Sequence, residues 1–179
     1  DFVLHLGDFI YERSWNARSN GLPHSRKVPP FPDGVDGPEA RYAVSLADYR
    51  HLYRTYLEDP HLQEARARWP FVCTWDDHEF CNDNFQSFSS YGKGSRREPQ
   101  RRLDANQAWF EYIPCVLSEL ENQPAHDFRT RKLTGDDGEQ NLAAAGSLLI
   151  YRQLRWGRDQ DLLITDSRSY RSPPCLPAG

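Results

Sequence analysis

Residues 70–79 read Pro70-Phe71-Val72-Cys73-Thr74-Trp75-Asp76-Asp77-His78-Glu79, an apolar run typical of a strand followed at once by four ionisable side chains. Adjacent carboxylates repel one another, so this density of charge is costly unless something compensates it. A bound cation is the simplest compensation, and a solvated acidic turn is the alternative. The segment therefore predicts a strand that ends at a functional site, where His78 could act as a general acid or donate to an anionic oxygen.

A second strand-like run, residues 2–6, is closed by Gly7 and Asp8. We expect a buried strand whose glycine lets a metal or phosphate approach the backbone. The alternative is a plain strand-to-turn junction, with Asp8 as a helix cap and Tyr11 as a core aromatic. Because the carboxyl ends of parallel strands meet at one edge of an α/β sheet, the two acidic strand ends should lie close together.

The rest of the chain alternates helix and strand signals, which favours an α/β fold. Pro, Gly, Asn and Ser residues break both periods over 14–44 and predict a long loop. Ser45 with Asp48, and Asp59 with Pro60, are helix-start signals. We expect helices over 45–58, 59–68 and 99–117 (the last bent or ended by Pro114), a polar loop over 81–97, a surface connection with some strand over 120–145, and paired strands over 148–154 and 161–165.

The composition is that of one folded domain, with 179 residues of which 38% are hydrophobic and 27% charged. The 22 Lys and Arg residues against 26 Asp and Glu give a net charge of −4, so no overall positive field would gather nucleic acid. No apolar run approaches the roughly 20 residues of a membrane span, and we expect no membrane insertion through this chain. Because the sequence lacks methionine and starts inside a strand-like run, we expect it to be a fragment.

Four segments resemble, in order, motifs of the alkaline phosphatase D (PhoD-like) metallophosphatase family. They are Leu4-His5-Leu6-Gly7-Asp8-Phe9-Ile10-Tyr11-Glu12, then Ala47-Asp48-Tyr49-Arg50 with Asp59-Pro60, then Thr74-Trp75-Asp76-Asp77-His78-Glu79 with Asn82, and finally Thr165-Asp166-Ser167-Arg168-Ser169-Tyr170-Arg171. The resemblance implies a calcineurin-like sandwich of two β-sheets flanked by helices, of which residues 1–179 would be one partial domain truncated at both ends. It also implies hydrolysis of phosphate monoesters and diesters at a multinuclear site, typically holding ferric iron with calcium, and other divalent metals stay open.

The resemblance also implies roles for individual residues. Asp8 would be the carboxylate that bridges the metals, and Tyr11 would be a phenolate ligand to iron. Asp77 would be a ligand on the calcium side, with Asn82 as a further ligand. His78 would stabilise or protonate the departing oxygen. Carboxylates and a phenolate suit hard cations, so the donor chemistry agrees with these roles.

Some expected parts of the site have no match in this sequence. The family supplies one metal ligand from an earlier strand end and others from a later Gly-Asp-x-His type motif, and neither is present. We expect His126, the one histidine after His78, to be a surface residue. For Asp166, Arg168 and Arg171, a structural network at the strand end and contact with phosphate through arginine stay equally open.

The leading hypothesis is a metal-dependent hydrolase that frees phosphate from small-molecule phosphate esters, with the active site only partly present in this chain. Two alternatives stay open: a non-catalytic fragment with weak or no metal binding, and a nuclease-type phosphodiesterase on the same scaffold. The acidic net charge speaks mildly against a polymeric substrate, so no nucleic acid partner is expected. By resemblance the parent protein would be periplasmic or secreted, and the sequence leaves its oligomeric state open.

Overall fold

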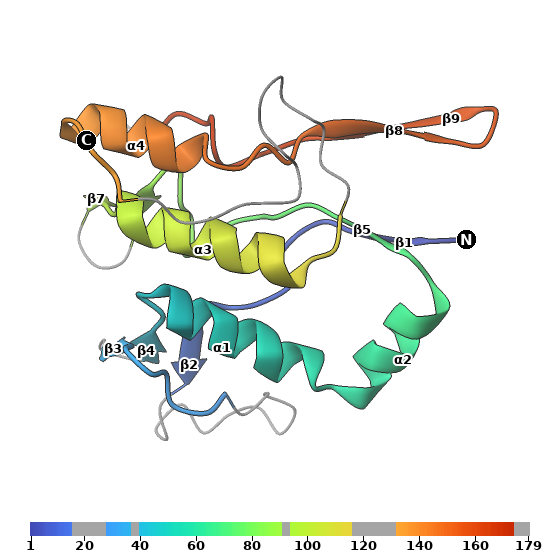
Figure 1. Cartoon of the computed structure of the whole chain (residues 1–179), viewed down its shortest axis with the longest axis horizontal. Helices are drawn as coiled ribbons and strands as arrows, with labels where there is room; N and C mark the ends of the chain where they lie inside the picture. The colour runs from blue at the N-terminus through green and yellow to red at the C-terminus, as the bar shows by residue number, and fades with distance from the viewer. Residues whose placement is uncertain (16–27, 37–39, 91–93, 116–131, 174–179) are drawn as a thin grey trace, which may run out of the picture.

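The computed structural model describes residues 1–15, 28–36, 40–90, 94–115 and 132–173, and Figure 1 shows their arrangement. These ranges form a mixed α/β structure with four helices and several small sheets. The helices are α1 (Leu46–Leu57), α2 (Pro60–Arg68), α3 (Pro99–Tyr112) and α4 (Asp137–Ala145). The strands are β1 (Val3–His5), β2 (Arg13–Trp15), β3 (Val35–Asp36), β4 (Ala40–Tyr42), β5 (Phe71–Cys73), β6 (Phe88–Ser89), β7 (Arg96–Arg97), β8 (Arg152–Trp156) and β9 (Gln160–Ile164).

Strands β1 and β5 form the parallel pair that the sequence predicts. Val3 lies opposite Phe71 and His5 opposite Cys73, so both strands end at the same edge. The expectation that β1 is buried is wrong, because Leu4 is 45% exposed. Successive side chains of a strand point to opposite faces, and Val3 and His5, on the face opposite to Leu4, are half-buried. On β5, the Phe71 ring lies 5.6 Å from the Arg66 guanidinium of α2.

Helices α1 and α2 begin as the capping signals predict. Ser45 caps α1 in a capping box with Asp48, and Asp59 caps α2 with Pro60 in its first turn. Asp48 is fully buried and also accepts the backbone N–H groups of Asp33, at 2.8 Å, and of Val44, at 2.9 Å. This one carboxylate therefore ties the chain before α1 to the helix start.

Helix α3 ends just before Pro114, as one of the two expectations for this proline had it, and α4 corrects the expected surface connection. Ile113 is extended, with φ −105° and ψ 98°, because the residue before Pro114 is disfavoured in a helix. Residues 116 and 117 of the predicted helix lie outside the described residues, as does His126. The expected surface connection over 120–145 contains α4, which starts with a capping box between Asp136 and Glu139 and ends in three consecutive alanines.

The loops and the late strand pair also differ in detail from the expectations. Part of the predicted 14–44 loop is a three-stranded antiparallel sheet in the order β2-β4-β3, and the 81–97 loop contains the pair β6–β7. Strands of two or three residues are too short to give a periodic signal. The late hairpin is confirmed as β8–β9, but β8 starts at Arg152, and Leu148 and Ile150 belong to the core instead.

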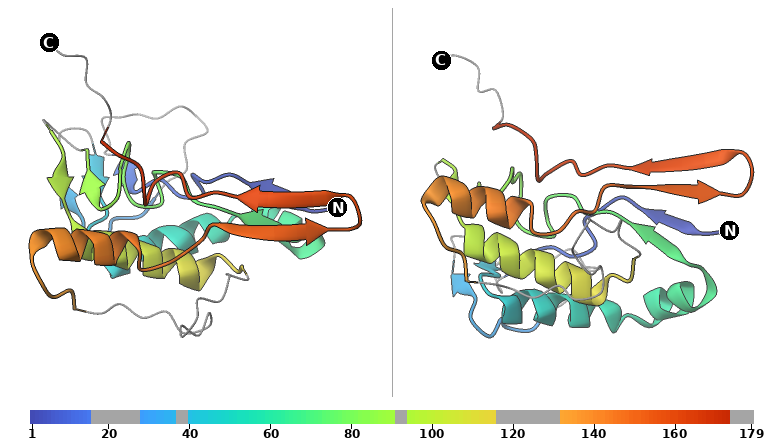
Figure 2. Two further views of the ribbon diagram at one scale, coloured as in Figure 1. Left: turned by 90° about the horizontal axis from the view of Figure 1, so that it is seen from above. Right: turned by 45° about the horizontal axis from the view of Figure 1, so that its top comes forward.

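The core lies where α3 packs between α1 and α4, with β1, β5 and the β8–β9 hairpin along one side (Figures 1 and 2). Trp75, directly after β5, meets Trp109 of α3 edge to face at 5.2 Å. Arg102 is 1% exposed and stacks over Trp75 at 4.9 Å. None of the four helices in the described ranges combines the length and the apolar character that crossing a bilayer requires.

Gly7 lets the ends of β1 and β5 approach closely. Its φ is 109°, and a Cβ there would lie 2.3 Å from the Asp76 nitrogen and 2.6 Å from the carbonyl carbon of Trp75. The expectation that Gly7 makes room for a metal or phosphate is therefore corrected: the group that needs this space is the backbone of the neighbouring strand end.

Replacing Gly7 by alanine should destabilise the chain by about 2–5 kcal/mol, from backbone strain and the clash with Asp76 together. Chemical unfolding followed by circular dichroism measures this loss. Gly94 is a matched control, because its φ is 94° but a Cβ there meets no atom within 4 Å. Gly94→Ala should cost about 1–3 kcal/mol, from strain alone. Equal losses in the two variants would contradict the role assigned to the close approach.

Candidate metal centre

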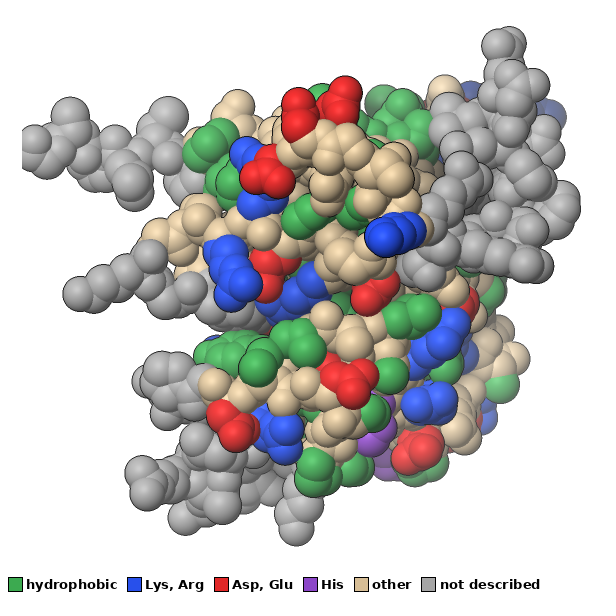
Figure 3. Space-filling model, turned by 60° about the vertical axis from the view of Figure 1, so that its left-hand side comes forward, with side chains coloured by type: hydrophobic (Ala, Val, Ile, Leu, Met, Phe, Trp, Pro, Cys, Tyr) green, Lys and Arg blue, Asp and Glu red, His purple; other side chains and the backbone are tan. Residues whose placement is uncertain are grey.

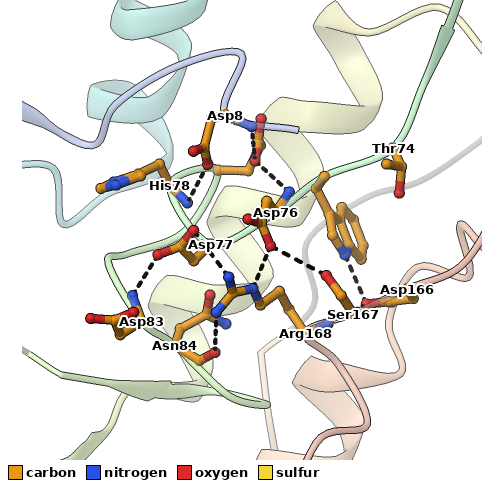
Figure 4. Close-up of polar contacts among 12 residues, drawn as sticks. Asp8, Thr74, Asp76, Asp77, His78, Asp83, Asn84, Asp166, Ser167 and Arg168 are labelled. Carbon is orange, nitrogen blue, oxygen red and sulfur yellow. Dashed lines mark hydrogen bonds and ion pairs between the residues drawn. The ribbon is translucent and has the colours of Figure 1, made fainter. Parts of the chain in front are cut away.

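Asp8, Asp77 and His78 come together at the shared edge of β1 and β5 (Figure 4). Each offers one ligand atom, and these three atoms lie within 4.8 Å of one another. Asp77 and His78 are buried, whereas Asp8 is half-buried. The structure thus places the two acidic strand ends side by side, as the sequence predicts.

Asp8 occupies a left-handed backbone conformation, with φ 56°, which Asp and Asn adopt more readily than most residues. From the residues that the structure describes, its carboxylate accepts two hydrogen bonds, both long: one from the His78 backbone N–H at 3.4 Å and one from the Tyr11 hydroxyl at 3.5 Å. Burial raises the pKa of Asp8. The charge of His78 lowers it and that of Asp77 raises it, and the pKa remains above its usual value. A cation beside this carboxylate would satisfy its free oxygens and favour its charged form.

Glu79, the last acid of the cluster, turns away from the other donors and binds backbone. Its carboxylate accepts N–H groups from Phe9 at 2.6 Å, from Asp76 at 2.8 Å and from Asp8 at 3.1 Å. Burial raises the pKa of Glu79 to about 7 although the three N–H donors oppose the shift. Glu79 therefore joins the loops after β1 and β5, and it does not belong to the group of three ligand atoms.

Asp76 is compensated by Arg168, which follows β9. Arg168 Nε lies 2.5 Å from Asp76 Oδ1, and its Nη2 lies 3.3 Å from Asp77 Oδ1. Its third nitrogen, Nη1, donates to the Asn84 carbonyl at 3.4 Å. Asp166 Oδ1 fixes the same turn by accepting the Trp75 indole N–H at 2.9 Å and the Arg168 backbone N–H at 3.0 Å.

These contacts favour the structural network over phosphate contact for Asp166 and Arg168. The guanidinium of Arg168 already contacts two carboxylates and a carbonyl. Burial lowers the pKa of Arg168, but Asp76 and Asp77 outweigh this effect, so that the pKa is raised. Arg171 is exposed, and its backbone carbonyl accepts from the Gln86 side chain at 3.5 Å. The charge of the acidic segment is thus offset partly by the protein itself, which the sequence prediction of a cation did not consider.

His78 is paired with Glu12, a residue to which the sequence prediction gave no role. Nδ1 of His78 lies 2.7 Å from Oε2 of Glu12, and Glu12 is completely buried. Burial lowers the pKa of His78, but the hydrogen bond and charge of Glu12 outweigh it, with help from Asp77, so that the pKa is raised. Glu12 closes the first motif, yet it lies in a loop where no periodicity indicates which way its side chain points.

Tyr11 and Asn82 lie beside the cluster with partners of their own. The Tyr11 ring lies 4.0 Å from the His78 ring, centroid to centroid, and burial together with Asp8 raises the pKa of its hydroxyl. Asn82 donates its side-chain amide to Asp83 at 2.8 Å and its backbone N–H to Glu12 at 2.9 Å. Asp83 in turn donates its backbone N–H to Asp77 at 2.6 Å, so Asn82 belongs to the loop that supports Asp77.

Known proteins are similar to this chain in sequence and in fold. The family model described as PhoD-like phosphatase matches residues 1–177. The chain is 28% identical over 171 residues to alkaline phosphatase D of Bacillus subtilis (strain 168). This match covers 96% of this chain and 24% of that protein. A solved structure described as "Structure of PhoD" is similar with a TM-score of 0.65 and 28% identity, over 96% of this chain and 27% of that chain.

The chain spans about a quarter of the length of each of these two relatives. Within this chain the first and third motifs carry the three donor groups that the structure brings together. Since the family model covers nearly all of its residues, this chain belongs to the PhoD-like phosphatase family.

Proposed function

We propose that the protein containing this chain is a metal-dependent phosphatase that hydrolyses monoesters and diesters of phosphate. The observation that carries the proposal is the convergence of Asp8, Asp77 and His78 within 4.8 Å at one sheet edge, in a member of the PhoD-like family. The calcineurin-like sandwich and a periplasmic or secreted location belong to the same proposal, and family membership supports both.

The donor set fits hard cations such as ferric iron and calcium. Asp8 and Asp77 would hold them with carboxylate oxygens, Tyr11 with its phenol oxygen and Asn82 with its amide oxygen. Burial raises the pKa of both Asp8 and Tyr11, with neighbouring carboxylates adding to the shift, and a cation beside them would favour their charged forms. When bound, the cations would offset the charge of the phosphoryl oxygens and make water more acidic.

His78 would act on the leaving group. As water forms the new bond to phosphorus, the bond to the ester oxygen breaks and its electron pair stays on that oxygen. The free ring nitrogen of His78, Nε2, gives this oxygen a proton, and the proton released by the water restores the ring. Glu12 on Nδ1 keeps the ring in place throughout.

Small phosphate esters are the proposed substrates. The net charge of −4 offers no general attraction to a polyanion. On the face drawn in Figure 3, acidic and basic side chains are interspersed rather than gathered by sign. A panel of nucleotide, sugar and nitrophenyl phosphates beside oligonucleotides tests this choice, and faster turnover of the oligonucleotides would favour the nuclease alternative.

Removing either carboxylate should remove bound metal and activity together. In the gene product that contains these residues, Asp8→Asn and Asp77→Ala should each lower metal affinity by more than about 100-fold, since loss of an outer partner alone costs 10- to 100-fold. Asparagine at position 8 keeps the left-handed backbone accessible. Metal content by mass spectrometry and turnover of a nitrophenyl phosphate measure both effects.

The matched control is Asp161→Asn, because Asp161 pairs with Arg155 in the β8–β9 hairpin, away from the donor cluster. It should keep both metal and turnover. Wild-type metal content and turnover in Asp8→Asn and Asp77→Ala would overturn the proposal. Calorimetric titration of the 179-residue chain with calcium, and with terbium(III) as a soluble trivalent probe, separates a self-sufficient site from a fragment that binds weakly.

His78→Gln should separate proton donation from metal binding. If His78 serves the leaving group, kcat for an alkyl phosphate, whose leaving oxygen needs a proton, should fall by about 10²- to 10⁴-fold while metal content stays at the wild-type level. His61→Gln is the control, since His61 is an exposed histidine on α2. Loss of metal from His78→Gln would instead make His78 a ligand.

A further inference from the structure

We infer that Glu12 is a positioning residue for His78: its buried carboxylate fixes which ring nitrogen faces the substrate. The inference rests on the proposed function for its effect on catalysis. Its structural part, the state of the His78 ring, can be measured without any activity.

Both oxygens of Glu12 are engaged. Oε2 lies 2.7 Å from His78 Nδ1, and Oε1 accepts the Asn82 backbone N–H at 2.9 Å. The side chain is 0% exposed, so water cannot take the place of either partner. Glu12 thus ties the His78 ring to the backbone of the loop that supports Asp77.

An ionised carboxylate accepts hydrogen bonds and donates none. The short contact therefore places a proton on Nδ1 of His78 whether or not the ring is charged. Within the described ranges Nε2 has no hydrogen-bond partner, which leaves it as the nitrogen that can meet a ligand. The Tyr11 ring, 4.0 Å away and inclined by 30°, packs against the imidazole and limits its rotation.

A glutamine at position 12 would lose this selection. Its amide presents either an oxygen or an NH₂ group to Nδ1, so the neutral ring is no longer held in one tautomer. With the NH₂ group against Nδ1 the ring cannot carry protons on both nitrogens, and only a doubly protonated ring can give the leaving oxygen its Nε2 proton and remain a neutral imidazole. Leaving groups that need protonation should suffer most.

The first experiment uses the 179-residue chain without metal. Long-range ¹H–¹⁵N spectra at alkaline pH, where the imidazole is neutral, should show His78 with its proton on Nδ1 in the wild type. Glu12→Gln should show a mixture or the opposite tautomer. A proton on Nε2 in the wild type, or an unchanged tautomer in Glu12→Gln, would overturn the inference.

The second experiment compares two esters in the gene product that contains the chain. Glu12→Gln should lower kcat for an alkyl phosphate by at least about tenfold, but for a nitrophenyl phosphate, whose leaving group needs no proton, by less than about threefold. Asp48→Asn is the matched control, because Asp48 is also 0% exposed and binds backbone N–H groups but does not contact His78.

The control should lose thermal stability and treat the two esters alike. Equal losses on both esters in Glu12→Gln would reduce Glu12 to a structural residue and overturn the inference. If the wild-type protein hydrolyses neither ester, the proposed function fails, and the tautomer measurement alone decides the role of Glu12. The two failures are thus distinguishable.

Discussion

The candidate site depends on one buried carboxylate, that of Glu79. Its Oε2 accepts backbone N–H groups from both Asp8 and Asp76, which belong to loops about 70 residues apart in the chain. The parallel pairing of β1 and β5 brings these loops to one edge, and the absence of a side chain at Gly7 lets them close. The carboxylate then fixes their separation, so that the donor atoms of the two loops converge.

The acidic residues at this edge divide into two groups. Glu79 is satisfied by backbone N–H groups and Asp76 by Arg168, and these two acids stabilise the arrangement. Asp8, by contrast, accepts only long hydrogen bonds within the described part of the chain, so a cation would stabilise it more than the other two acids. Two of these acids thus stabilise the structure, whereas the carboxylate of Asp8 can bind a cation.

The sequence predicted the parts of the fold that rest on local signals. The starts of α1 and α2 and the β8–β9 hairpin are confirmed, because each depends on residues close together in the chain, and the meeting of the two strand ends follows from the parallel pairing of β1 with β5. The short sheet strands were missed, since so few residues give no periodicity, and α4 was missed although a capping box between Asp136 and Glu139 marks its start. At the site, Asp8, Asp77 and His78 were placed together correctly, but the partners Glu12 and Arg168 depend on side-chain directions in loops, which no spacing encodes.

The turn that carries Arg168 lies 91 residues after Asp77 and 92 after Asp76. A ribosome completes the acidic strand end long before it adds the arginine that neutralises it. Until then the carboxylates repel one another, and this edge of the sheet stays open to water and ions. Contacts of such long range form late, because loop closure must come first. The contacts of Arg168 with Asp76 and Asp77 can therefore form only after most of this chain has been synthesised.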